Sequence, residues 1–258
     1  MDVMKKVCDA LNYNKELKYE QKVEILDLVT DFYVRFPNVS LENLCKNLKG
    51  LRIERGSKFQ YPATVQYVPF GNKIVINKVR EANLENDKRH SMMRAVLAMI
   101  TSNTIYYGFN NNPSLEALNE GFCDIMANNL VGNHGLSDYE DEQILVNFIG
   151  KSIGIENFQK AFFENDSELL MKELLSKCSS PEKLEGLLGQ ANNNMKTRMN
   201  SGQSRLFHIQ AGAMQMFEYD KDYIMTSQTL QSSGVKYLDI EEIDNLVKTQ
   251  ARNWARGR

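Results

Sequence analysis

Two carboxylates one helical turn apart are the residues of this chain best suited to chemistry. Glu120 and Asp124 lie in a segment of helical periodicity, so their side chains face the same side of a helix. A carboxylate pair of that kind can hold a cation or share a proton. Arg94 lies upstream, in another segment of helical periodicity. The stretch from Lys88 to Leu130 therefore contains the main candidate site.

This stretch resembles the thermolysin-like branch of the zinc metallopeptidases. The segment ALNEGFCDIMANN resembles the glutamate helix of that family, with Glu120 in the metal-ligand position and Asp124 in the position that orients a ligand histidine. Upstream, RAVLAMIT resembles a helix of the form HExLHMIT. In this register Arg94 replaces the first histidine, Ala95 the general base and Ala98 the second histidine.

The resemblance implies a vestigial site, with the fold kept and the catalytic residues lost. Ala95 cannot take a proton and Ala98 has no lone pair, so zinc hydrolysis in this register is excluded. An alternative register that begins at His90 supplies neither the base nor the second histidine, and it matches the apolar positions less well. Glu120 and Asp124 by themselves would form a weak site, closer to an exposed magnesium or calcium contact than to a zinc site.

Loss of the metal leaves a charge problem that Arg94 can solve. Two neighbouring carboxylates in a protein interior are costly without a counter-ion. A guanidinium is always charged and can bridge two carboxylates through its five N–H donors. We therefore predict that Arg94 takes the place of the cation and pairs with Glu120, Asp124 or both. An Arg94 side chain that points to solvent would contradict this hypothesis.

The composition is that of an ordinary soluble globular protein. The chain has 258 residues and a formal net charge of -2, which gives no general attraction to nucleic acid or anionic membranes. The basic end, ARNWARGR, is explained by cations that complement a helix dipole, so we expect no nucleic-acid binding. The N-terminus does not resemble a signal peptide, and no apolar run of about 18 residues indicates a membrane span. We therefore expect a cytoplasmic protein.

The cysteines and histidines do not form a pattern typical of a metal site. The four cysteines contain no CxxC pair, and with three histidines they do not support a zinc finger. Cys123 lies beside the two acids, but no histidine is placed to activate it, so a buried thiol is expected. His134 is interpreted as structural, and the resemblance implies at most a transition-state role for His208. We expect no metal and no cofactor.

Helical periodicity predominates, with one β-rich region. Residues 17–36 predict a helix, in which Val23, Leu26, Val29 and Tyr33 recur at helical spacing. Runs of β-branched and aromatic residues predict a hairpin of two strands, Ala63–Val68 and Lys73–Asn77. Other helices are predicted over residues 2–12, 41–50, 86–106, 115–131, 137–154, 155–164, 166–177, 203–220 and 240–256. A further helix is predicted to begin at residue 181. Ser114 is predicted to cap the helix over 115–131. The segment 192–205 is predicted to be polar and exposed.

These elements predict an α+β fold dominated by helices. A small edge-strand sheet near residues 60–77 should pack on the zincin-like helices that carry Arg94 and Glu120, and the C-terminal half should be helical. We expect a single zincin-like unit over residues 1–258. Its N-terminal lobe would be residues 1–135 and its C-terminal lobe residues 136–258.

The resemblance, which covers residues 60–175, implies a protein without catalytic activity. Such a protein would bind a peptide along its edge strand, or bind a protein partner. Two other functions stay open. One is an active hydrolase with an unrecognised site. The other is a helical interaction or scaffold protein without metallopeptidase ancestry, and it predicts that the hairpin does not run beside the Arg94 helix.

Overall fold

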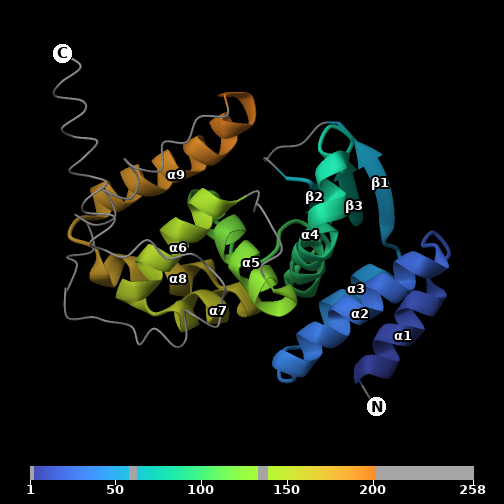
Figure 1. Cartoon of the computed structure of the whole chain (residues 1–258). Coiled ribbons are helices and arrows are strands. Elements are labelled where there is room, and N and C mark those ends of the chain that lie inside the picture. The colour runs from blue at the N-terminus through green and yellow to red at the C-terminus, as the bar shows by residue number, and fades with distance from the viewer. Residues whose placement is uncertain (1–2, 58–62, 133–138, 202–258) are drawn as a thin grey trace.

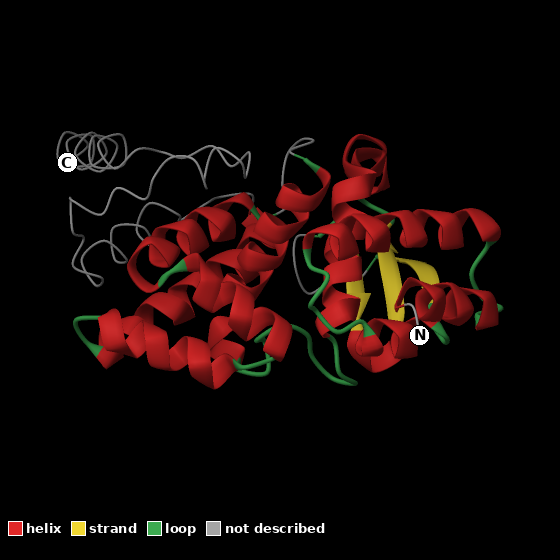
Figure 2. Cartoon of the chain, turned by 90° about the horizontal axis from the view of Figure 1, so that it is seen from below, coloured by secondary structure: helices red, strands yellow, loops and turns green. Residues whose placement is uncertain are grey.

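The structure, a computed structural model, describes residues 3–57, 63–132 and 139–201. Its described helices are α1 (Val3–Tyr13), α2 (Tyr19–Arg35), α3 (Glu42–Leu48), α4 (Glu81–Thr101), α5 (Glu116–Val131), α6 (Glu140–Ile153), α7 (Ile155–Glu164), α8 (Ser167–Lys177) and α9 (Pro181–Ser201). The described strands are β1 (Arg52–Gly56), β2 (Val65–Val68) and β3 (Lys73–Asn77). The predicted helix-dominated α+β fold is confirmed (Figures 1 and 2).

The sheet has the order β1–β3–β2, with β1 parallel and β2 antiparallel to β3. The predicted hairpin is therefore present. Its turn ends at Asn72, whose φ of 43° is left-handed, a conformation that asparagine tolerates. The Asn72 side chain holds the turn, because it accepts from Tyr67 Oη at 3.0 Å and donates to Asn47 O at 2.8 Å. Strand β1 was not predicted, since Ile53 is its only large apolar residue.

Helices α4 and α5 form the centre of the molecule. Both hairpin strands pack on α4, which also contacts α2, α3 and α5. The sheet and α1–α3 lie on one side of this pair, and α6–α9 lie on the other (Figure 1). Every residue from His90 to Ile100 is buried, as are nearly all residues of α5. The segment that carries the candidate site is thus the core itself.

The fully buried residues of helix α2 differ in part from the residues whose spacing predicted the helix. Its core-facing residues are Ile25, Leu28, Val29 and Phe32. Of the predicted set, Val29 is buried, Leu26 and Tyr33 are half-buried, and Val23 is 48% exposed. The predicted helix is confirmed, and Leu26 and Tyr33 pack against the core, but α2 carries apolar residues on two adjacent faces. Helical periodicity does not indicate which of the two the rest of the chain covers.

Helix α9 continues into the segment predicted to be polar and exposed. Asn194 and Met195 are buried, and Asn194 Nδ2 lies 3.4 Å from Asp141 Oδ2 on α6. Lys196 Nζ pairs with Glu116 Oε2 at 2.5 Å. The exposed assignment was therefore wrong for this part of the segment, because partners on α5 and α6 satisfy its polar groups.

Two predicted helix ends also need correction. Ser114 does not cap α5. It lies in a 3-10 turn, Pro113–Leu115, where its amide donates to the side chain of Asn112. At the other end, α4 stops at Thr101 rather than near residue 106. Asn103 breaks the helix because its side chain accepts the amides of Ile105 and Tyr106, which forms a turn.

Among the helices that the structure describes, none has both the length and the apolar character needed to cross a bilayer. The predictions for 203–220 and 240–256, for His134 and His208, and for the basic C-terminal end lie outside the described residues.

Candidate functional site

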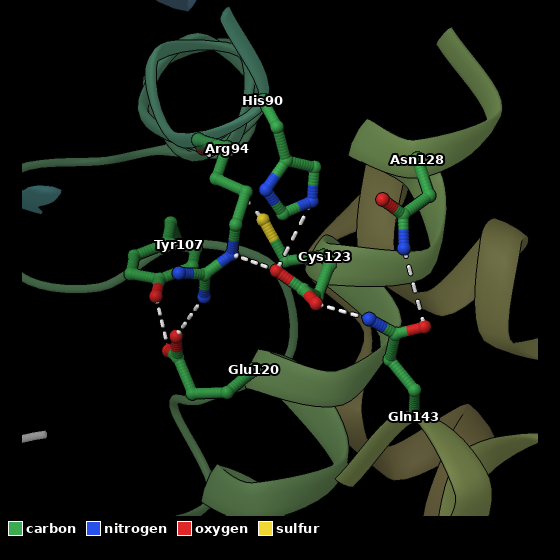
Figure 3. Close-up of polar contacts among 8 residues, drawn as sticks. His90, Arg94, Tyr107, Glu120, Cys123, Asn128 and Gln143 are labelled. Atoms are coloured by element: carbon green, nitrogen blue, oxygen red, sulfur yellow. Dashed lines mark hydrogen bonds and ion pairs between the residues drawn. The ribbon is translucent and has the colours of Figure 1, made fainter. Parts of the chain in front are cut away.

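Arg94 lies between the two carboxylates (Figure 3). Its Nη2 donates to Glu120 Oε2 at 2.7 Å, and its Nε lies 2.8 Å from Asp124 Oδ1 as an ion pair. All three residues are buried, with exposed fractions of 6% for Arg94, 2% for Glu120 and 0% for Asp124. The predicted pairing is therefore confirmed, and Arg94 contacts both acids rather than one.

Close packing of α5 and α6 brings further partners to this cluster. Gly121 follows Glu120 in the interior of α5, and a Cβ placed there would lie 2.4 Å from the backbone oxygen of Glu142. Any larger residue would push α6 away. Because Gly121 allows the close approach, α6 delivers Gln143 to Asp124 and Tyr139 to Arg94.

The site contains Tyr107 and Gln143, which the sequence did not predict, and His90, which the sequence suggested only as the start of an alternative register. Tyr107 Oη donates to Glu120 Oε1, and Gln143 Nε2 donates to Asp124 Oδ2 (Figure 3). His90 Nε2 lies 3.3 Å from Asp124 Oδ1. His90 precedes Arg94 by one helical turn, so that spacing could have indicated it. Tyr107 and Gln143 come from other elements, and no local pattern singles them out.

Two further contacts extend the cluster. The guanidinium carbon of Arg94 lies 3.9 Å from the centre of the Tyr139 ring, a cation–π contact. Asn128 Nδ2 donates to Gln143 Oε1 at 3.3 Å, so a chain of polar contacts runs from Arg94 through Asp124 and Gln143 to Asn128. We call the set His90, Arg94, Tyr107, Glu120, Asp124, Tyr139 and Gln143 the Arg94 cluster. It joins α4, α5 and α6.

Burial and the neighbouring groups act in opposite directions on the pKa values of the cluster. Burial raises the pKa of the Glu120 carboxyl, although Arg94 and Tyr107 act to lower it. Burial alone would lower the pKa of Arg94, but Tyr139, Asp124 and Glu120 together hold that pKa well above its ordinary value. The guanidinium is therefore a fixed positive charge, and it faces two acids.

Cys123 is buried, as predicted, and its Sγ lies 3.6 Å from Arg94 O. Burial raises the pKa of its thiol, which keeps the sulfur protonated at neutral pH. The thiolate is the reactive form of cysteine, so this residue does not act as a nucleophile.

The residues around Arg94 do not fit a zinc ion. The guanidinium stands between the two carboxylates, and Ala95 and Ala98, both buried, offer only methyl groups. Within residues 3–57, 63–132 and 139–201, no group of three or more His, Cys, Asp or Glu side chains is arranged to hold a metal ion. No chemical step through a metal is derived for this site.

The fold and the site define a helix-dominated α+β protein built around a buried arginine and two carboxylates. Comparison of the chain with protein-family models, with curated protein sequences and with solved structures found no match. The function must therefore be argued from the fold and the site.

Proposed function

We propose that the protein is a catalytically inactive, metallopeptidase-like protein that acts by binding a peptide or a protein partner. The proposal rests on the position of Arg94 between Glu120 and Asp124. A fixed cation thus neutralises the two carboxylates that a metal centre of the thermolysin type would use. The hairpin packed on α4 supports the proposal, because a scaffold protein of other ancestry does not require that arrangement.

Glu120 is poorly placed to act as a general base in an unrecognised hydrolase. Its Oε1 accepts from Tyr107 and its Oε2 accepts from Arg94, so both oxygens are engaged. The side chain is also buried, which separates it from any substrate in solvent. A general base must reach the proton that it abstracts. Binding without catalysis is the function that this geometry supports best.

Of the two edges of the sheet, β1 and β2, the β1 edge is the one that we propose for an extended peptide. Strand β2 forms one edge, but its residues Val65 and Tyr67 are buried. Strand β1 forms the other, and Arg52 and Arg55 on it are exposed. The parallel register with β3 directs the amide of Ile53 away from β3. An added strand would accept this amide hydrogen bond.

Restoring the missing residues tests the ancestry. The variant Arg94→His/Ala95→Glu/Ala98→His is expected to bind one equivalent of zinc, measured by elemental analysis of the purified protein after dialysis. The matched control adds Glu120→Gln, which removes a carboxylate ligand and should abolish zinc binding. If the triple variant keeps its circular dichroism spectrum but gains no zinc, the metallopeptidase ancestry is wrong. A scaffold protein of other origin would then be the better proposal.

A peptide-display selection against the full chain tests the binding function. We expect selected peptides that bind the wild type and lose affinity for Ile53→Pro, which removes the outward amide. Ile53→Ala is the matched control, because it truncates the same side chain and keeps the amide. Peptides that bind Ile53→Pro as tightly as Ile53→Ala would show that β1 is not the binding edge.

A further inference from the structure

Helix α2 presents a second apolar face along its whole length. We call it the α2 stripe, and it consists of Tyr19, Val23, Leu26, Thr30, Tyr33 and Val34. The first five positions recur every three or four residues, and Val34 follows Thr30 by four, so all six share one side of the helix. Tyr19 and Val34, near the two ends of the stripe, are 77% and 74% exposed. The hydroxyl of Thr30 donates to Leu26 O at 2.8 Å, so it is satisfied within the helix.

The arrangement of the stripe distinguishes it from scattered surface residues. Single exposed apolar residues are common and need no explanation. Here the exposed apolar residues Tyr19, Val23 and Val34 share one side of α2, whose 17 residues correspond to about 25 Å, and Leu26 and Tyr33 between them pack in part against the core. Two of the six are tyrosines, a residue type enriched at protein interfaces. The stripe includes Val23, Leu26 and Tyr33, whose helical spacing predicted this helix from the sequence.

An acidic ridge runs beside the stripe. It consists of Glu20, Glu24, Asp27 and Asp31, all on α2. Two cations from α4 already bind there, since Lys88 Nζ lies 2.9 Å from Glu24 Oε2 and Arg89 Nη1 lies 2.6 Å from Asp27 Oδ2. Asp27 keeps 58% of its side chain exposed. Glu20 makes no ion pair with any residue that the structure describes.

We propose that the α2 stripe binds an amphipathic helix of a protein partner whose apolar face is bordered by lysine or arginine. The inference rests on the proposed binding function and names a surface and a partner for it. The backbone hydrogen bonds of α2 are internal, so recognition must use side chains, as in the packing of two helices. Glu24, Asp27 and Asp31 already have cations from α4, so Glu20 and the exposed part of Asp27 are the charges that favour lysine or arginine along the border of the partner helix.

Two synthetic helical peptides are the probes. Both have leucine and isoleucine along one face, and one carries lysine and arginine beside that face where the other carries glutamate. Fluorescence anisotropy with the full chain should show binding of the basic peptide and at least about tenfold weaker binding of the acidic one. Glu20→Gln should weaken only the basic peptide, and added salt should do the same.

Neutral polar substitutions locate the binding surface. Tyr19→Ser/Val34→Ser changes two exposed positions, and we expect the fold to persist and the affinity for the basic peptide to fall about tenfold. Leu175→Ser is the matched control, because Leu175 is an exposed apolar residue of α8, at the other end of the molecule (Figure 1). The affinity of the Leu175→Ser variant for the basic peptide should equal that of the wild type.

Three results would overturn the inference. They are a basic peptide that does not bind, equal binding of both peptides, and binding that Tyr19→Ser/Val34→Ser leaves unchanged. A dimer of the full chain that this double substitution dissociates would assign the stripe to a second copy, which also overturns it. None of these results bears on zinc binding by the restored variant. Failure of the stripe and failure of the proposed function can therefore be told apart.

Discussion

Two arginines of α4 each bridge two carboxylates, but in opposite surroundings. Arg94 binds Glu120 and Asp124 in the protein interior. Arg89, little more than one turn earlier, binds Asp27 at 2.6 Å and also Asp31, with 43% of its own side chain exposed. The chemical groups are nearly the same, so the two clusters differ mainly in their access to water.

Access to water decides what each cluster contributes. An exposed ion pair competes with solvent, is screened by salt and contributes about 0–1 kcal/mol. A buried pair has lost its hydration, so removal of one partner leaves an uncompensated charge that costs about 3–5 kcal/mol. The ion pairs of Arg89 with Asp27 and Asp31, which we call the Arg89 cluster, therefore contribute little to the packing of α2 on α4. The Arg94 cluster, in contrast, makes the stability of the core depend on a single cation.

The largest expected effect is that of Arg94→Met. This substitution keeps an unbranched side chain of similar reach but leaves Glu120 and Asp124 without a cation. We expect a loss of about 3–5 kcal/mol in the free energy of unfolding, measured by urea denaturation. A loss below about 1 kcal/mol would mean that the buried ion pairs of Arg94 contribute no more to stability than exposed ion pairs do.

Gly121→Ala should have the next largest effect. The new methyl would lie 2.4 Å from Glu142 O, so α6 must shift and carry Gln143 away from Asp124. Overpacking of this kind costs about 1–3 kcal/mol, to be measured by thermal unfolding. Gly189→Ala is the control, because a Cβ there meets nothing within 4 Å, and it should be neutral or stabilising. Equal results for both glycines would mean that the close approach is not required.

The pH dependence of the buried cluster follows from Glu120. Its pKa in the folded protein is raised above the ordinary 4.5, so the folded state holds the proton more tightly than the unfolded state does. The resulting stabilisation is present below pH 4.5 and is lost as pH rises through the raised pKa. Relative to Glu120→Gln, which does not titrate, the wild type should therefore lose stability as pH increases above 4.5.

Urea denaturation of both proteins across that pH range is the measurement. A wild type that gains stability over Glu120→Gln as pH rises would reverse the conclusion. It would mean that Arg94 and Tyr107 stabilise the charged carboxylate by more than its burial costs.

The smallest expected effect is that of Arg89→Met. Water and salt already weaken its pairs with Asp27 and Asp31, so we expect a loss of about 0–1 kcal/mol that disappears in 1 M salt. Thermal unfolding at low and high salt measures it. A loss as large as that of Arg94→Met would show that burial is not what separates the two clusters.

The parts of the fold that depend on local sequence could be predicted. The β2–β3 hairpin is encoded by two β-rich runs around a turn, and most helices by their own periodicity. Strand β1 was not predicted, because β1 has a single large apolar residue, Ile53, and its parallel partner β3 is distant in sequence. The fully buried residues of α2 could not be selected from its periodicity for a related reason, because what covers a helix is set by the rest of the chain.

The site divides in the same way. The contact of Arg94 with Glu120 and Asp124 could be predicted because buried carboxylates require a counter-charge, and Arg94 is the cation that the resemblance puts near them. Tyr107 and Gln143 could not, because they come from a loop and from α6, whose approach depends on the packing of Gly121. That the cluster descends from a metal site stays a prediction.

The central claim is that the guanidinium of Arg94 holds the place of a divalent cation. Arg94→His/Ala95→Glu/Ala98→His removes the guanidinium and places two imidazoles beside Glu120, and zinc should then stabilise the protein by binding only its folded state. We predict that zinc raises the thermal midpoint of this triple variant by several degrees, but not that of the wild type or of the triple variant with Glu120→Gln. A midpoint of the folded triple variant that zinc leaves unchanged would contradict the claim.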